Sequence, residues 1–220
     1  MQPIENAVIA AAGLGSRLGL GHPKCMLEIS GVTLLSRMIR LLERHVSVIH
    51  VVIGYREELI IEHCARHHPS VVLVRNPEFR TTNTAHSLSL GARHLAGKCV
   101  FVDGDLVIEP DSFAAFLERS AQTDLLLGLC TPTTENAVYA HCEDTGDGLA
   151  ISGFTRDQQT AHEWANIFTG PSSIMDTAQN YVFEQLANHL PLPGMHLNLA
   201  EIDTTADLKA AQAFVEKFNL

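Results

Sequence analysis

The feature that most constrains the fold is an alternation of short apolar runs with amphipathic segments. The apolar runs have the length and composition of buried strands and lie at residues 7–12, 48–53, 71–74, 99–102 and 125–129. The segments between them repeat apolar side chains at helical spacing, at residues 33–45, 57–67, 85–95 and 110–120. Strands and helices in alternation form a parallel sheet covered by helices on both faces. The sequence therefore predicts a three-layer α/β/α fold with a mostly parallel central sheet.

The pattern changes after Thr131. Strand-like segments at 138–141 and 149–154 flank a turn-rich stretch, which predicts an antiparallel hairpin, and residues 165–175 predict one more strand. We therefore expect residues 131–175 to form a small antiparallel insertion within one domain that spans residues 1–220. Helices are predicted at 177–189 and 206–218, the second with a capping box of Thr204 and Asp207.

Charge and cysteine content exclude several classes of function. The net charge of -10 argues against a broad nucleic-acid interface, which needs clustered cations. The apolar runs are far shorter than the roughly 18 residues of a membrane span, and no basic residue precedes the first of them, so we expect a cytoplasmic protein without a membrane segment. Five cysteines without a CxxC pair indicate core residues rather than disulfides or a cysteine zinc site.

A glycine-rich loop follows the first predicted strand, at residues 11–24. Gly13 and Gly15 permit backbone conformations in which consecutive amides face an anion, and Arg17 and Lys24 add positive charge. The loop lacks the GxxxxGK[ST] pattern of a Walker loop. It also lacks the third glycine of a dinucleotide fingerprint, because Leu18 stands there. The loop is therefore predicted to bind phosphates in another way.

The loop resembles the signature of the MobA-like and sugar-phosphate nucleotidyltransferases, which has the form AAGxGxR followed by PK. This sequence carries it as residues 11–17 with Pro23 and Lys24. The resemblance implies a Rossmann-like nucleotidyltransferase fold and transfer of a nucleotide with release of pyrophosphate. It also implies two sets of roles: the triphosphate is bound by Ala11, Ala12, Gly13, Gly15 and Ser16, and the charge of the reaction is stabilised by Lys24 and Arg17.

Two acidic elements predict a magnesium site. The apolar strand at 99–102 ends in Asp103 and Asp105, an arrangement that is costly without a nearby cation. In the related enzymes a metal-binding aspartate follows this strand in a Gly-Asp pair, which Gly104 and Asp105 match. Strand alternation puts Glu201 and Asp203 on one face, and Asp203 is the better ligand by resemblance. We expect Asp105 and Asp203 to bind Mg²⁺, and Asp103 to lie in the nucleotide site.

The donor base and the acceptor are predicted from two further segments. In the family, a loop like that at 76–92 contacts the base, which suggests Asn83, Thr84 and Ser87. Thr82, Asn83 and Thr84 equally suit a helix cap. The spacing of Asn76, Asn83 and the Ser87-Leu88 pair, together with DGD at 103–105 and EID at 201–203, is most similar to the phosphocholine cytidylyltransferases. This similarity implies CTP as the donor. An aromatic and acidic acceptor site for a quaternary ammonium group would be formed by Tyr139, Glu163 and Trp164.

Several alternatives stay open at this point. The acceptor could be phosphocholine, a phosphonate such as 2-aminoethylphosphonate, or a sugar or polyol phosphate, the last with CTP or another triphosphate. An NAD- or FAD-dependent oxidoreductase and a non-catalytic nucleotide-binding regulator are the alternatives from other classes. The sequence leaves the oligomeric state open, with a homodimer as one option.

Overall fold

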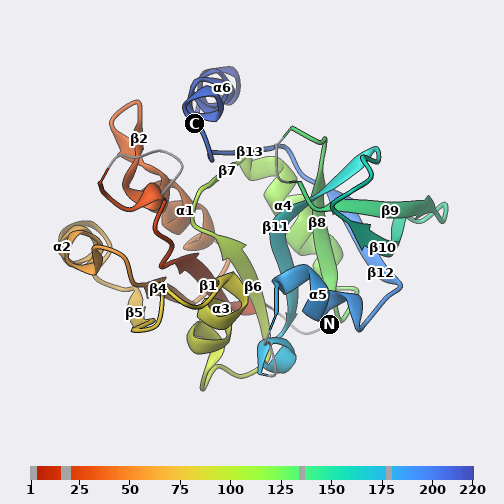
Figure 1. Cartoon of the computed structure of the whole chain (residues 1–220), viewed down its shortest axis with the longest axis horizontal. Coiled ribbons are helices and arrows are strands. Elements are labelled where there is room, and N and C mark those ends of the chain that lie inside the picture. Colours follow the sequence, from red (N-terminus) through yellow and green to blue (C-terminus); the bar gives the residue numbers. More distant parts are fainter. Residues whose placement is uncertain (1–3, 16–20, 134–136, 177–179) are drawn as a thin grey trace.

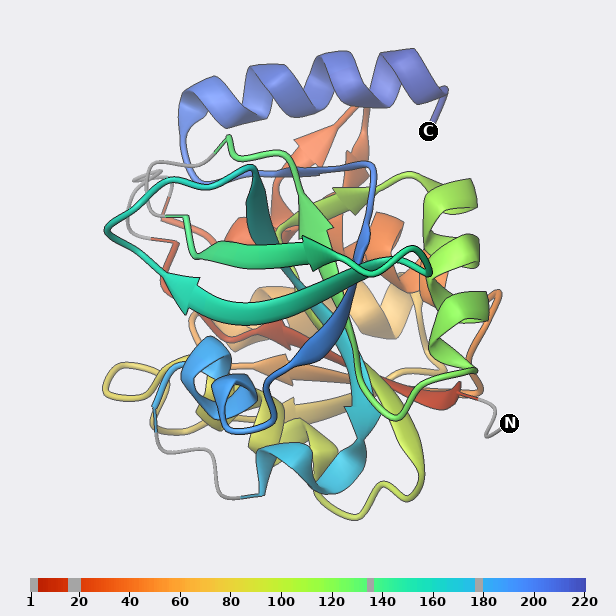
Figure 2. The same cartoon turned by 90° about the vertical axis from the view of Figure 1, so that its right-hand side faces the viewer.

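The protein, described here by a computed structural model, forms one nine-stranded sheet with helices on both faces (Figures 1 and 2). The structure describes residues 4–15, 21–133, 137–176 and 180–220. In spatial order the sheet consists of β5 (Val72–Arg75), β4 (Val48–Ile53), β1 (Ile4–Ala11), β6 (Lys98–Asp103), β11 (His162–Pro171), β8 (Leu126–Cys130), β12 (Leu192–His196), β10 (Leu149–Thr155) and β9 (Tyr139–Asp144). Two short ribbons stand apart from it, β2 (Glu28–Ile29) with β3 (Val32–Thr33) and β7 (Leu106–Ile108) with β13 (Leu199–Glu201).

The helices largely follow the predicted pattern. They are α1 (Leu34–Leu42), α2 (Glu57–His67), α3 (Thr84–Ala92), α4 (Pro110–Ser120), α5 (Val182–Ala187) and α6 (Thr205–Phe218), with short 3₁₀ helices at Lys24–Met26 and Ser172–Met175. The predicted bounds of α2 and α4 are confirmed, and α1 and α3 end a few residues earlier than predicted. In the described part of the chain, none of the helices combines the length and the apolar character needed to cross a lipid bilayer.

Side chains of the central strands alternate between two cores, which confirms the three-layer fold. On β1, Ala7 and Ile9 pack with α1, α2 and α4, whereas Val8 packs with α3 and α5 on the opposite face. This is the period of two expected for a strand buried on both sides. Strand β1, which leads into the glycine-rich loop, is thus packed on both faces.

The sheet is parallel in its first half and largely antiparallel in its second. Strands β5, β4, β1 and β6 are parallel, and β9 and β10 form the predicted antiparallel hairpin. The structure adds that β11 lies inside the central sheet, antiparallel to both β6 and β8. The predicted antiparallel segment is therefore part of the same sheet, with β11 inside it and the β9–β10 hairpin at its edge.

Helix α6 covers the β7–β13 ribbon. Its start is fixed by the predicted capping box, in which Thr204 Oγ1 accepts from the Asp207 amide at 3.3 Å and Asp207 Oδ2 accepts from the Thr204 amide at 2.7 Å. Ala211 and Val215 then pack on Val107 in a third, smaller core. The ribbon between α6 and the main sheet carries Glu201, and Asp105 directly precedes β7.

The cysteines are core residues, as predicted, and their thiols should react slowly. All five are free, and Cys142 alone among them is not buried. Burial raises the thiol pKa to about 12 for Cys25, Cys99 and Cys130, with help from nearby carboxylates at Cys25 and Cys130, and to about 11 for Cys64 and Cys142. Thiolates, which react with iodoacetamide, are therefore scarce at pH 8.

We expect iodoacetamide at pH 8 to label Cys142 slowly in the native protein and the other four still more slowly. In guanidinium chloride all five should be labelled, as mass spectrometry of the intact protein would show. Rapid labelling of Cys25 or Cys99 in the native state would contradict their burial.

Candidate active site

A cavity of about 380 Å³ opens where β1 and β6 end. Loops that follow parallel strands meet at this edge of a sheet, and ligands of such folds bind there. The cavity brings together most of the residues predicted for the nucleotide and the metal: Ala11, Ala12, Gly13, Gly15, Lys24, Asn83, Thr84, Ser87, Asp103, Asp105 and Asp203. Segments far apart in the sequence thus form one site.

The glycine-rich loop turns so that it approaches Lys24. Gly15 has a left-handed backbone with φ of 57°, and a Cβ placed there would lie 3.4 Å from Lys24 Cβ. A residue with a side chain would be strained at that φ. Lys24 itself begins a 3₁₀ helix directly after Pro23. The predicted site residues Ser16 and Arg17 lie outside the described residues, so their roles stay predictions.

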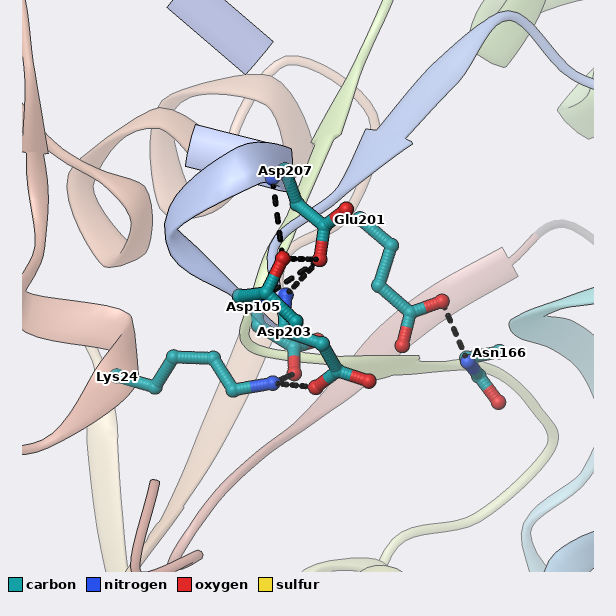
Figure 3. Close-up of polar contacts among 7 residues, drawn as sticks. Lys24, Asp105, Asn166, Glu201, Asp203 and Asp207 are labelled. Carbon is teal, nitrogen blue, oxygen red and sulfur yellow. Dashed lines mark hydrogen bonds and ion pairs between the residues drawn. The ribbon is translucent and has the colours of Figure 1, made fainter. Parts of the chain in front are cut away.

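Lys24 bridges two of the predicted metal ligands (Figure 3). Its Nζ donates to Asp105 Oδ2 at 2.6 Å and also to Asp203 Oδ1. Burial disfavours the ammonium charge, but the carboxylates of Asp105 and Asp203 outweigh burial and raise the pKa of Lys24. Lys24 is therefore a permanent cation in this site and cannot act as a general base at neutral pH.

Gly104 lets the chain cross the end of β1. Its amide donates to Ala10 O at 2.9 Å, and a Cβ at this position would lie 3.0 Å from that same oxygen. The close approach places Asp103 and Asp105, the residues on either side, at the cavity. Burial, and secondarily the neighbouring Asp105, raises the pKa of Asp103 well above its usual range. Burial and the charge of Asp105 thus disfavour the ionised form of Asp103.

The acidic group contains Glu201 as well as the two predicted ligands. Asp105, Glu201 and Asp203 each offer a carboxylate oxygen, and these atoms all lie within 4.8 Å of one another. Asp105 Oδ1 is buried and has no hydrogen-bond partner among the described residues. Burial and the charges of Asp105 and Asp203 raise the pKa of Glu201. Oxygen ligands around an unsatisfied carboxylate oxygen fit a hard divalent cation such as Mg²⁺.

Glu201 is oriented by a residue that sequence reasoning missed. Asn166 of β11 donates from Nδ2 to Glu201 Oε2 at 3.1 Å (Figure 3). Asn166 has a left-handed backbone with φ of 53°, at a point where the register between β11 and β8 shifts. Asparagine tolerates this conformation better than most residues. The only sign of this role in the sequence is that an asparagine stands within a strand-like apolar run.

The loop before α3 lines the cavity opposite the carboxylates. Asn83 caps α3, because its Oδ1 accepts from the His86 amide at 3.2 Å, and it donates to Asn180 O at 2.9 Å. Ser87 is buried, and its Oγ accepts from Asn76 at 3.1 Å. Both therefore have structural roles, and the capping alternative holds for Asn83. They also line the cavity together with Thr84.

Two lining residues of the same loop were not predicted. Phe79 and Arg80 both border the cavity, and the Arg80 guanidinium lies 5.3 Å from the centre of the Phe79 ring. An aromatic ring and a cation beside a phosphate loop are suitable for a nucleotide. The sequence contained this signal in the polar stretch that precedes α3.

The residues predicted for the acceptor are not among the described residues that line this cavity. Tyr139 and Glu163 are paired across β9 and β11. Glu163 is 2% exposed and accepts from the Thr133 amide at 3.0 Å. Trp164 is 6% exposed and packs in the core on the α3 side of the sheet. The three residues are neighbours, but in this structure Glu163 and Trp164 are buried.

Comparison with protein families identifies the family to which the chain belongs. The model of the MobA-like NTP transferase domain matches residues 7–159. The chain belongs to the MobA-like NTP transferase family. The matched segment contains the glycine-rich loop, Lys24, the loop before α3 and the Asp103–Asp105 element, which all border the cavity.

Individual relatives agree with the family. The bifunctional protein GlmU of Methanococcus vannielii is 29% identical over 201 residues, which cover 84% of this chain and 44% of the relative. The 2-aminoethylphosphonate cytidylyltransferase of Lancefieldella rimae is 32% identical over 111 residues, covering 48% of this chain and 45% of the relative. The matched segments thus cover less than half of each of these curated relatives.

Solved structures share the fold. The CTP:phosphocholine cytidylyltransferase LicC from Streptococcus pneumoniae superimposes with a TM-score of 0.76 and 19% identity, over 98% of this chain and 100% of that one. The predicted nucleotidyltransferase fold is therefore confirmed.

Proposed function

We propose that this family member is a magnesium-dependent cytidylyltransferase. It would transfer CMP from CTP to a small phosphorylated or phosphonate acceptor and release pyrophosphate. The observation that carries the proposal is that the glycine-rich loop, Lys24, Asp105 and Asp203 border one cavity, with a carboxylate oxygen of Glu201 within 4.8 Å of those of the two aspartates. Relatives named as cytidylyltransferases, for 2-aminoethylphosphonate and for phosphocholine, support CTP as the donor.

The chain's own groups suit nucleotidyl transfer. An oxygen of the acceptor's phosphate or phosphonate attacks the α-phosphorus of CTP. A new P–O bond forms as the bond to the β-phosphate oxygen breaks, and pyrophosphate leaves with the electron pair. The attacking oxygen is already ionised at neutral pH, so no side chain has to remove a proton. The chain needs to position two anions and offset their charge.

Lys24 is placed to offset that charge. Its ammonium group lies at the cavity beside Asp105, and its raised pKa keeps it protonated. The amides of the loop around Gly13 and Gly15 would bind the triphosphate, and Arg80 provides a second cation at the rim. Arg17 is proposed for the same role from the sequence pattern alone. Fixed donors of this kind stabilise charge that develops in the transition state.

A magnesium ion would be held by Asp105 and Asp203, with Glu201 as a third ligand. Bound there, it would supply positive charge to both the triphosphate and the acceptor. Asn166 would keep Glu201 turned toward the other two carboxylates. Asp103 would lie behind them at the end of β6, and Asn83, Thr84 and Ser87 would face the cytosine base.

The acceptor is proposed by class. Phosphocholine and 2-aminoethylphosphonate are the first candidates because relatives carry these names, and a sugar or polyol phosphate is the second. Tyr139, Glu163 and Trp164 remain the proposed acceptor residues. Since Glu163 and Trp164 are buried, we propose that the acceptor reaches them only after local movement of the β9–β11 region.

A pyrophosphate-release screen tests the proposal. CTP, UTP, GTP and ATP would each be combined with phosphocholine, 2-aminoethylphosphonate, glucose 1-phosphate and inositol 1-phosphate in the presence of MgCl₂. We expect pyrophosphate release with CTP and an acceptor that carries an ammonium group, either phosphocholine or 2-aminoethylphosphonate. Release with the purine triphosphates should be at least about 100-fold slower. Activity with UTP or GTP alone would contradict the choice of base, and CTP binding without release would favour the regulator.

A further inference from the structure

A second cavity, of about 280 Å³, lies between α1 and β7. Its apolar floor includes the half-buried Val32, Pro110 and Leu220, and the lining also contains the buried Met38 and Leu41 of α1 and Leu106 and Ile108 of β7. Its polar lining consists of Ser30 and three arginines, Arg37, Arg40 and Arg44. This cavity does not include the residues of the nucleotide cavity, and nothing in the transfer reaction uses it.

The three arginines form an unneutralised cationic edge. They stand three and four residues apart, so they share one side of α1 and its C-terminal end, where like charges repel. None of the ion pairs found within the described residues involves them. A cluster of this kind is unusual in a chain with net charge -10. It costs stability unless an anion lies beside it.

Arg37 shows the missing partner most clearly. Its Nη2 donates to Ile29 O at 2.5 Å, whereas its Nε is buried without a hydrogen-bond partner in the described part of the chain. Burial, and then the charge of Arg40, lowers the pKa of Arg37. A bound anion would offset both effects on the pKa of Arg37, since opposite charge stabilises a partly buried guanidinium.

The apolar floor is directly connected to the carboxylate site. β7 begins immediately after Asp105, and its first residue, Leu106, is paired with Glu201 across the ribbon. A molecule bound in this cavity therefore lies against β7, the strand that directly follows Asp105 and pairs with β13, which carries Glu201. Restraint of this strand would restrain their positions.

We propose that this second cavity binds a small anion that carries an apolar group, and that its occupation stabilises the β7–β13 ribbon. The anionic group lies against the arginines, and the apolar group covers Val32, Pro110 and Leu220, the half-buried apolar residues of the lining. Inorganic phosphate would leave the floor exposed to water, and a neutral apolar molecule would leave the cations unpaired. The site would thus allow an amphipathic metabolite to adjust the enzyme from outside its active site.

The probe for the test is 1-anilinonaphthalene-8-sulfonate, an aromatic anion whose fluorescence rises in apolar surroundings. We expect saturable binding, weakened about tenfold or more in Arg40→Ala/Arg44→Ala and largely retained in Arg40→Lys/Arg44→Lys. The matched control is Arg66→Ala/Arg75→Ala, which removes two exposed arginines that already pair with Glu62 and Glu57. It should bind the probe as the unmodified protein does.

Hydrogen exchange measures the effect on the ribbon. The amides of residues 106–108 and 199–201 should exchange several-fold more slowly when the probe is bound, and this slowing should be lost in Arg40→Ala/Arg44→Ala. Both readouts are independent of nucleotidyl transfer, so they hold even if the donor or acceptor proposed above is wrong. Equal binding by the arginine and control variants, loss of binding in Lys24→Ala instead, or unchanged exchange of the ribbon would each overturn the proposal.

Discussion

Asp105→Asn is expected to lower the rate of pyrophosphate release by at least about 100-fold while the protein stays folded. Asp105 contacts Lys24 and belongs to the cluster of three carboxylates. One of its oxygens accepts from Lys24, and the other is buried without a partner in the described structure, where a cation would bind it. The amide keeps the shape of the side chain but removes the charge. Pyrophosphate release at saturating CTP, acceptor and MgCl₂ measures the loss.

Stability should not fall in Asp105→Asn, because the substitution removes one of several mutually repelling carboxylates. Burial and charge repulsion already raise the pKa of Asp103 and Glu201. A melting temperature equal to or above that of the unmodified protein would show this. Glu109→Gln is the matched control, since Glu109 caps α4 through the amides of Asp111 and Ser112. It should cost about 1 kcal/mol of stability and leave the rate intact. A near-normal rate for Asp105→Asn with magnesium would contradict the metal site.

Features set by neighbouring residues could be predicted from the sequence. The bounds of α2 and α4 and the capping box of Thr204 and Asp207 are such features, because helical periodicity and caps are local signals. The glycine-rich loop is also recognised from a local pattern, since its glycines and Lys24 lie within one short stretch. Resemblance then supplied Asp203, which comes from the far end of the chain.

Features set by pairing between distant strands could not be predicted. β11 lies between β6 and β8, but it is buried on both faces, so its apolar run gives no periodic signal that fixes its neighbours. Its placement is what brings Asn166 to Glu201. The membership of Glu201 in the acidic cluster likewise depends on its pairing with Leu106, a register that no local pattern specifies. Asp203 was preferred by resemblance to the related enzymes.

Lys24→Ala should also reduce turnover by about 100-fold or more, and it separates two roles of the ammonium group. Lys24 offsets charge on the nucleotide, and it holds Asp105 and Asp203 together before any nucleotide binds. Its removal leaves partly buried carboxylates without their cation. We therefore expect a loss of about 1 to 3 kcal/mol in the free energy of unfolding without magnesium.

Magnesium should reverse this loss of stability. Because the ammonium no longer occupies the carboxylates, MgCl₂ should raise the melting temperature of Lys24→Ala more than that of the unmodified protein, although the rate stays low. Lys209→Ala, which removes an exposed lysine from α6, is the control and should behave normally in both assays. An equal magnesium response in all three proteins would argue against a shared site for the ammonium and the metal. A full rate in Lys24→Ala would show that charge on the leaving pyrophosphate is stabilised elsewhere, with Arg17 and Arg80 as the next residues to test.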